Sequence, residues 1–152
     1  MTEGAPLESD QPIILPPGVG PSHRTPYGDE LVWKAGEAAT GGRFSLHERT
    51  APPGSRSVPH VHHHLVEAFY VLEGSCEFVV GDETVAAEAG TFVLVPRAVR
   101  HGWSVTGGER VSMLVFFTPS AKLAFFEEQQ ALLQSGGDAA EMRALAEKYD
   151  WT

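Results

Sequence analysis

The stretch GSRSVPHVHHHLVEAFYVLEG, residues 54–74, decides how this 152-residue chain folds. It holds four histidines within five positions, and a run of strand-forming residues follows them. In an extended chain, residues two apart point to the same side, so His60 and His62 can hold one ion together. Glu67 has the opposite parity and joins them only if the chain turns at residues 63–65. The spacing therefore predicts a chelating pair, a turn and a returning strand whose inner face carries Glu67.

A third imidazole has to come from elsewhere in the chain. The stretch GTFVLVPRAVRH, residues 90–101, is a second strand-like segment and ends in His101. Of the other histidines outside the cluster, one lies in a proline-rich N-terminal region and one has no ligand-type neighbour in sequence. His101 is therefore the expected third imidazole. His64 shares the parity of His60 and stays open as an alternative ligand, although the spacing to Glu67 favours His60.

Short β-rich runs alternate with turn residues through the middle of the chain. The 16 glycines and 11 prolines suit many short strands better than long helices. The expected strands are residues 31–34, 43–50, 66–72, 76–80, 83–87, 91–95, 101–105 and 109–117. This rhythm predicts an antiparallel sandwich or barrel. Residues 69–72 and 92–95 are apolar on both faces, which predicts that both faces are covered.

The ends of the chain differ from its middle. The expected segments are an irregular proline-rich arm over residues 1–29, a β domain over residues 30–118 and two amphipathic helices over residues 119–152. Thr118 predicts a helix N-cap with Pro119 at the first helical position. Asp138 and Glu141 have the spacing of a capping box for the second helix. Both helices are expected to pack on the β domain or on a dimer partner.

Two motifs carry a resemblance to the cupin family, and they are Gly54-x5-His60-x-His62-x4-Glu67-x6-Gly74 and Gly90-x5-Pro96-x-Ala98-x2-His101. Ala98 stands where the family usually has glycine, and Val105 stands where it often has asparagine. The resemblance implies an all-β fold, an antiparallel β-barrel or jelly roll, followed here by two C-terminal α-helices. It also implies the metal ligands, which are His60, His62, Glu67 and His101.

These ligand types indicate the kind of ion. Three imidazoles and one carboxylate suit a divalent transition metal, and they leave one or two positions open in a five- or six-coordinate shell. Iron, manganese, nickel, cobalt, copper and zinc all fit this donor set. The lack of cysteine ligands argues against a closed structural zinc site.

The chain is most similar to small single-domain cupins related to quercetin dioxygenases, in which EAFYVLEG (residues 67–74) and FVLVPR (residues 92–97) are typical. This resemblance implies a dioxygenase that acts on a flavonol-like, phenolic or enolic small molecule. Glu67 would then act both as a ligand and as the catalytic base. Two alternatives stay open: a redox-neutral isomerase, lyase or cyclase, and a metal or small-ligand binding module without catalysis.

Strand parity also predicts a pocket wall. Phe69 shares the inner parity of Glu67, and Trp103 shares that of His101. Further candidates on an early strand and on the last strand are Leu46, Met113 and Val115. No ligand anchors the parity of these two strands.

The remaining features mainly exclude functions. A formal net charge of -9 repels nucleic acid and anionic membranes on average. The longest uncharged apolar stretch, residues 111–117, is far shorter than a membrane span. A lone cysteine, Cys76, and the lack of a secretory signal pattern predict a cytoplasmic protein in which Cys76 is a small core residue. The expected partners are a small-molecule substrate and a second copy of the chain in a homodimer.

Overall fold

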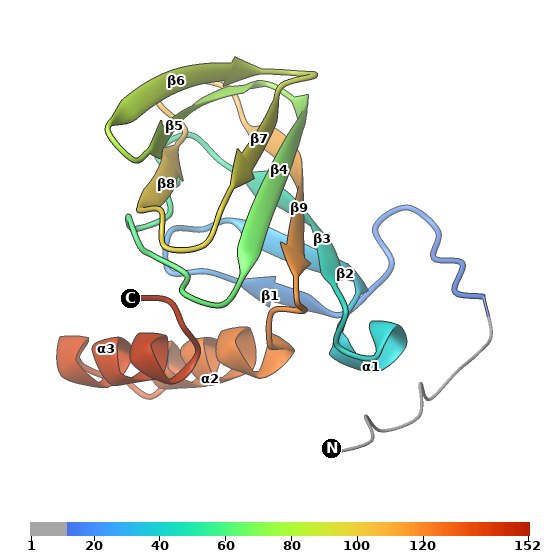
Figure 1. Cartoon of the computed structure of the whole chain (residues 1–152), viewed down its shortest axis with the longest axis vertical. Coiled ribbons are helices and arrows are strands. Elements are labelled where there is room, and N and C mark those ends of the chain that lie inside the picture. The colour runs from blue at the N-terminus through green and yellow to red at the C-terminus, as the bar shows by residue number, and fades with distance from the viewer. Residues whose placement is uncertain (1–11) are drawn as a thin grey trace.

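The chain forms two antiparallel β-sheets with two longer helices beside them in the computed structural model, which describes residues 12–152 (Figure 1). The strands are β1 (Ser22–Arg24), β2 (Glu30–Ala35), β3 (Ser45–Ala51), β4 (Val66–Glu73), β5 (Ser75–Val80), β6 (Glu83–Glu88), β7 (Phe92–Val95), β8 (His101–Ser104) and β9 (Val111–Thr118). The helices are α1 (Glu37–Thr40), α2 (Leu123–Gln134) and α3 (Ala139–Lys148). The larger sheet has the order β1-β2-β3-β9-β4-β7 and the smaller sheet the order β6-β5-β8. These two sheets confirm the predicted jelly roll, and the described strands do not close into one barrel.

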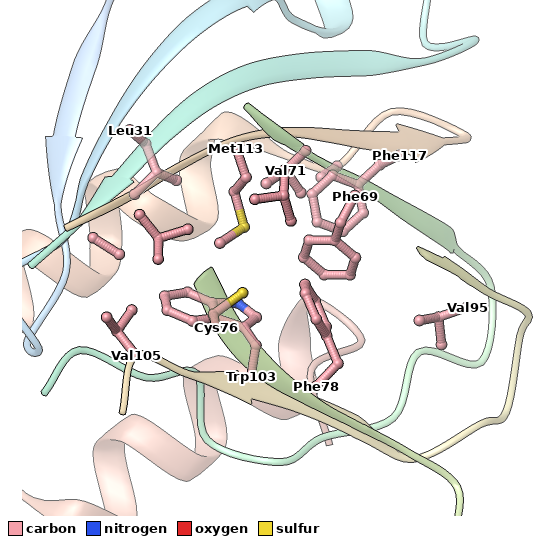
Figure 2. Packing of buried hydrophobic residues seen from close by; sticks show 14 of the residues in the cluster. Leu31, Phe69, Val71, Cys76, Phe78, Val95, Trp103, Val105, Met113 and Phe117 are labelled. Carbon is pink, nitrogen blue, oxygen red and sulfur yellow. The ribbon is translucent and has the colours of Figure 1, made fainter. Parts of the chain in front are cut away.

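The core lies between the sheets, where inward side chains of alternate residues meet (Figure 2). The inward residues of β9 are all fully buried, and they are Val111, Met113, Val115 and Phe117. Phe69 of β4 meets Phe78 of β5 with ring centroids 4.9 Å apart. Each such buried side chain stabilises the fold by roughly 1.5–3 kcal/mol. Cys76 lies in the same core, and burial raises the pKa of its thiol to about 11.

All eight predicted strands are confirmed, each to within two residues at its ends. The expected irregular arm contains one further strand, β1, which pairs His23 with Leu31 of β2. A three-residue strand is too short to show a period of two in its sequence. The sequence therefore did not reveal it.

The first long helix begins later than predicted. Thr118 still belongs to the β4–β9 ladder, and its hydroxyl donates a hydrogen bond of 3.0 Å to the carbonyl oxygen of Arg43. The residue predicted as the helix cap is thus held in a strand, and α2 begins at Leu123. The start of α3 is confirmed, because Asp138 and Glu141 form a capping box with bonds of 2.9 and 2.8 Å.

The prediction that residues 69–72 and 92–95 are covered on both faces is wrong for a single chain. The outward side chains of β4 and β7 remain open: Phe92 is 62% exposed, Leu94 54% and Tyr70 44%. On the inner face, by contrast, Phe69 and Val95 are buried. The outer face of this sheet is therefore apolar and uncovered by the described residues.

Candidate metal centre

Four ligand-type side chains meet between the two sheets. One potential ligand atom of each lies within 4.8 Å of all the others, and the four buried residues are His60, His62, Glu67 and His101. Glu67 comes from β4 and His101 from β8, so the carboxylate and the imidazole belong to opposite sheets. His60 forms a β-bridge with His101, with backbone hydrogen bonds of 2.9 Å in both directions. The backbone itself thus joins the two sequence motifs.

The backbone partners of the three imidazoles determine which nitrogen carries hydrogen. Each ring places its Nδ1 atom 2.6–2.9 Å from a backbone carbonyl oxygen. The pairs are His60 with Val58, His62 with Asp150 and His101 with Val99. A carbonyl oxygen only accepts, so each Nδ1 donates, and the lone pair of a neutral ring is then on Nε2. Bonds of this kind fix the tautomer and the orientation of metal-binding histidines.

The three Nε2 atoms converge on one carboxylate oxygen. The Nε2 atoms of His60 and His62 are 3.1 Å apart. Glu67 Oε2 lies 2.8 Å from His101 Nε2 and 3.2 Å from His62 Nε2. Two ligand atoms bound at right angles to one ion, at about 2.1 Å each, lie ~3.0 Å apart. The four side chains therefore fit a divalent metal ion in both chemistry and spacing.

Charge in the cluster favours a cation. Burial alone raises the pKa of the Glu67 carboxyl group, but contacts with His101, His60 and His62, which are hydrogen bonds when Nε2 carries a proton in place of a metal ion, outweigh it and hold the pKa well below the usual 4.5. Burial lowers the pKa of His101, but the hydrogen bond with Glu67 outweighs that effect and raises the pKa. Glu67 is thus a buried anion, which needs a positive partner.

His63 and His64 lie outside the cluster. Both side chains are exposed. Their backbone N–H groups donate to the carboxylate of Asp150, at 2.9 and 2.8 Å. The turn after His62 thus directs these two side chains away from the cluster while it leads the chain back to Glu67. Of the two ligand sets that parity left open, the structure brings together the one with His60.

The turn of the second motif, at Ala98, contacts the loop that carries His62. Ala98, which replaces the family glycine, has φ of 62°, in the left-handed region that glycine adopts more readily. Its N–H donates a hydrogen bond of 2.7 Å to the carbonyl oxygen of His62. The replacement therefore keeps the contact between the motifs at the cost of local backbone strain.

A cleft of about 800 Å³ borders the cluster, between the β domain and helices α2 and α3. His60 and Trp151 both lie in its lining. Most of the lining surface is apolar, with Phe125, Phe126 and Met142 among the side chains that form it, and three arginines also line the cleft. The cleft gives a small molecule a binding place next to a candidate metal ligand.

The residues predicted to form a pocket wall lie elsewhere. Four of them face inward as predicted but belong to the core and do not line the cleft, and these are Phe69, Trp103, Met113 and Val115. Leu46 lies on the opposite face of β3, because His47 and Arg49 occupy the inner face. The predicted residues therefore do not line this cleft, since side chains fill the space between the sheets and the cleft forms against the helices.

Two aromatic rings flank the imidazoles. Trp151 lies 5.1 Å from His60 between ring centroids, nearly parallel at 27°, and 4.6 Å from His62 at 89°. Phe117 lies 5.8 Å from His62, edge-on at 83°. The alternation of β9 predicts that Phe117 lies on the inner face with Met113 and Val115. No local pattern in the sequence points to Trp151, which reaches the site only because the chain after α3 folds back.

His47 is a buried histidine outside the cluster. Its ring packs against Trp33, Phe117 and Phe126, and neither ring nitrogen has a hydrogen-bond partner. Burial lowers the pKa of His47 well below its usual 6.5, and the neighbouring charge of Arg49 acts in the same direction. The ring is therefore neutral in the folded protein at neutral pH.

We expect His47→Phe to remove part of the acid sensitivity of the metal-free fold. The unfolded chain takes up a proton on His47 near its usual pKa of 6.5, whereas the folded protein does so only at lower pH. This contribution to stability is therefore complete above pH 6.5 and falls as the pH drops below it, by at most about 1.4 kcal/mol per pH unit. Urea unfolding at several pH values measures the slope. His64→Phe, at an exposed position, is the control, and equal slopes for wild type and His47→Phe contradict the expectation.

Comparison with known proteins agrees with this geometry. Residues 47–117 match the family model described as a cupin domain. A predicted oxalate decarboxylase from Thermotoga maritima is 22% identical over 60% of this chain and 80% of that chain, with a TM-score of 0.58. An RmlC-like cupin from Shewanella frigidimarina is 18% identical over 66% and 85%, with a TM-score of 0.59. A putative sugar phosphate isomerase from Acidithiobacillus ferrooxidans is 29% identical over 60% and 61%, with a TM-score of 0.52.

No curated protein sequence matches the chain. Within residues 12–152, no helix has the length and hydropathy needed to cross a membrane. The two antiparallel sheets form a β-sandwich. Three imidazoles and one carboxylate lie between the sheets as a candidate metal centre. The family model and the shared fold of the structural neighbours identify residues 47–117 as a cupin domain.

Proposed function

We propose that the chain binds a divalent transition-metal ion through His60, His62, Glu67 and His101. The observation that carries this proposal is the convergence of three Nε2 atoms on one carboxylate oxygen, while each Nδ1 is committed to a backbone carbonyl. The donor set fits iron, manganese, nickel, cobalt, copper or zinc. Supply in the cell and the open coordination positions then decide which ion is used.

The proposed activity is that of a dioxygenase acting on a small flavonol-like, phenolic or enolic substrate. A bound ion supplies Lewis acidity, which lowers the pKa of an enol or phenol group, and an open position for oxygen. In this proposal Glu67 holds the ion through Oε2, the oxygen that the histidines approach, and its carboxylate also takes the proton of the substrate hydroxyl. Trp151, which lines the cleft and stacks on His60, offers an aromatic contact to a planar substrate.

The cleft supports a substrate with an apolar body and an acidic oxygen. Arg56 and Arg143 lie in its lining, and neither forms an ion pair with any residue in the described range. The guanidinium of Arg56 lies 5.2 Å from the centre of the Tyr27 ring. Cations on a mostly apolar wall favour a ligand that combines an aromatic surface with negative charge.

A redox-neutral isomerase, lyase or cyclase is the second candidate. The likeness to a putative sugar phosphate isomerase, at 29% identity, favours it. Arg56 and Arg143 in the lining of the cleft also suit a phosphate group. Binding without catalysis is the third candidate, favoured by the position of Trp151 over His60 and His62, which narrows access to them.

Oxygen consumption separates these candidates. Metal-loaded protein is incubated with a flavonol, a dihydroxyaromatic compound or a 1,3-diketone, and the dioxygenase predicts oxygen uptake that accompanies loss of substrate. Conversion at the same rate without oxygen selects the redox-neutral enzyme. Recovery of an unchanged bound ligand after long aerobic incubation selects the binding module.

We also propose that two copies of the chain associate through the outer face of β4 and β7. Phe92 and Tyr70 are paired across these strands, and Leu94 lies on the same face. Strand β7 is at the edge of the larger sheet. A cluster of large exposed apolar side chains at a sheet edge is typical of an interface. In such a dimer the second copy covers the outer face of β4 and β7, as the apolar sequence of these strands predicts.

Phe92→Glu is expected to convert the homodimer to a monomer, because a charge at the centre of the buried patch would have no partner. Light scattering after size exclusion measures the mass. Val85→Glu, on an exposed apolar side chain of β6 in the other sheet, is the matched control and should leave the dimer intact. A monomeric wild type, or a dimer that survives Phe92→Glu, contradicts the proposal.

A further inference from the structure

Residues 150–152 follow α3 and fold back onto the loop that carries His60 and His62, so that the C-terminus lies between the helices and the sheets (Figure 1). Thr152 exchanges backbone hydrogen bonds with Val61: the Val61 N–H donates at 2.5 Å, and the Thr152 N–H donates at 3.2 Å. The tail is thus joined to the proposed metal loop in the manner of a short β-bridge.

Asp150 contacts the same loop through three oxygen atoms. Its backbone carbonyl oxygen accepts the hydrogen bond of 2.6 Å from Nδ1 of His62. Its carboxylate accepts from the backbone N–H groups of His63 and His64, with Oδ1 at 2.9 Å and Oδ2 at 2.8 Å. One residue therefore fixes both the ring of a proposed ligand and the path of the chain directly after that ligand.

The backbone conformation of Asp150 indicates that the turn alone does not account for an aspartate at this position. Its φ is 65°, in the left-handed region that favours glycine. Aspartate tolerates this region better than most residues but less well than glycine. A turn needed only to reverse the chain would be better served by glycine, so the carboxylate has to account for the aspartate.

We propose that Asp150 is a positioning residue of the metal centre, acting through His62 and through the backbone of His63 and His64. The inference rests on the proposed metal site. Acceptors behind a metal-binding imidazole fix its orientation, and their loss lowers metal affinity by about 10–100-fold. Asp150 also places the neighbouring Trp151, whose ring covers His60 and His62.

Two substitutions separate the carboxylate from the turn. Asp150→Gly keeps the left-handed turn and the backbone carbonyl but removes both carboxylate acceptors. Asp150→Asn keeps one acceptor oxygen. Asp82→Gly, in the exposed turn between β5 and β6, removes the same side chain away from the centre and is the control. The affinity for Co(II), measured against a competing chelator, is expected to fall by up to about 10-fold in Asp150→Gly, which keeps the carbonyl acceptor of His62 but frees the loop after it, and less in Asp150→Asn.

The absorption spectrum of bound Co(II) provides a second readout, because a reoriented His62 changes the ligand geometry. A changed spectrum in Asp150→Gly, partly restored in Asp150→Asn, supports the inference. Wild-type affinity and spectrum in Asp150→Gly overturn it, and so does a lower unfolding temperature of the metal-free variant with unchanged affinity. A wild-type protein that does not bind Co(II) refutes the metal centre itself and the inference with it, so the two failures are distinguishable.

Discussion

The His101→Ala protein is expected to bind a divalent transition metal at least about 100-fold more weakly than the wild type, because loss of a ligand costs more than the 10–100-fold seen for residues behind ligands. His101 Nε2 lies 2.8 Å from Glu67 Oε2, and its Nδ1 is held by a carbonyl oxygen. No other described histidine lies near enough to replace it. Equilibrium dialysis against chelator-buffered metal measures the affinity, and the folded state is checked by the unfolding temperature.

The neighbouring exposed histidines are the matched controls for this experiment. His63→Ala and His64→Ala remove an imidazole from the same loop without touching the cluster. Each is expected to change the metal affinity by no more than about twofold. If His64→Ala abolishes binding while His60→Ala retains it, the ligand set proposed from the structure is incorrect.

Glu67→Gln is expected to lower turnover by about 10²–10⁴-fold, because an amide cannot take the proton of the substrate hydroxyl. It also removes the one anionic ligand, so the metal has to be supplied in excess. The comparison is made with whichever substrate supports oxygen uptake by the wild type. The same substitution should leave the fold intact, since glutamine has nearly the same shape.

Substrate deprotonation can be observed directly without oxygen. A flavonol absorbs at longer wavelength as an anion than as a neutral molecule, so the wild type should shift the absorption of the bound flavonol. Glu67→Gln, with its metal site filled, should bind the flavonol without that shift. An unchanged shift and an unchanged rate of oxygen uptake in Glu67→Gln contradict the role of Glu67 as the base.

Part of the candidate metal centre was predictable from local geometry. The two-residue spacing of His60 and His62 puts both rings on one side, and one turn brings Glu67 back to them. The third imidazole comes from the opposite sheet, where His101 begins β8. Parity therefore indicated a chelating pair but left His64 open as an alternative, and the full set of four ligands came from the resemblance to the cupin motifs.

The cleft was not predictable, because tertiary packing of the helices creates it. Leu46 was assigned to the wrong face because no ligand fixes the register of β3. In the structure Ser45, His47 and Arg49 face inward and Leu46 faces outward, and the Ser45 hydroxyl accepts a hydrogen bond from the Ala121 N–H. Trp151 reaches the imidazoles only after α3 has docked and the chain has reversed. Contacts of this kind have no periodic signature in the sequence.

The most direct test of the metal centre is the metal content of protein purified without a histidine tag. Elemental analysis should find about one transition-metal ion per chain in the wild type and little in His101→Ala prepared in the same way. The identity of that ion also narrows the proposed chemistry. A wild-type protein that holds no stoichiometric metal, and takes none up when iron, manganese, nickel, cobalt, copper or zinc is supplied, would contradict the account.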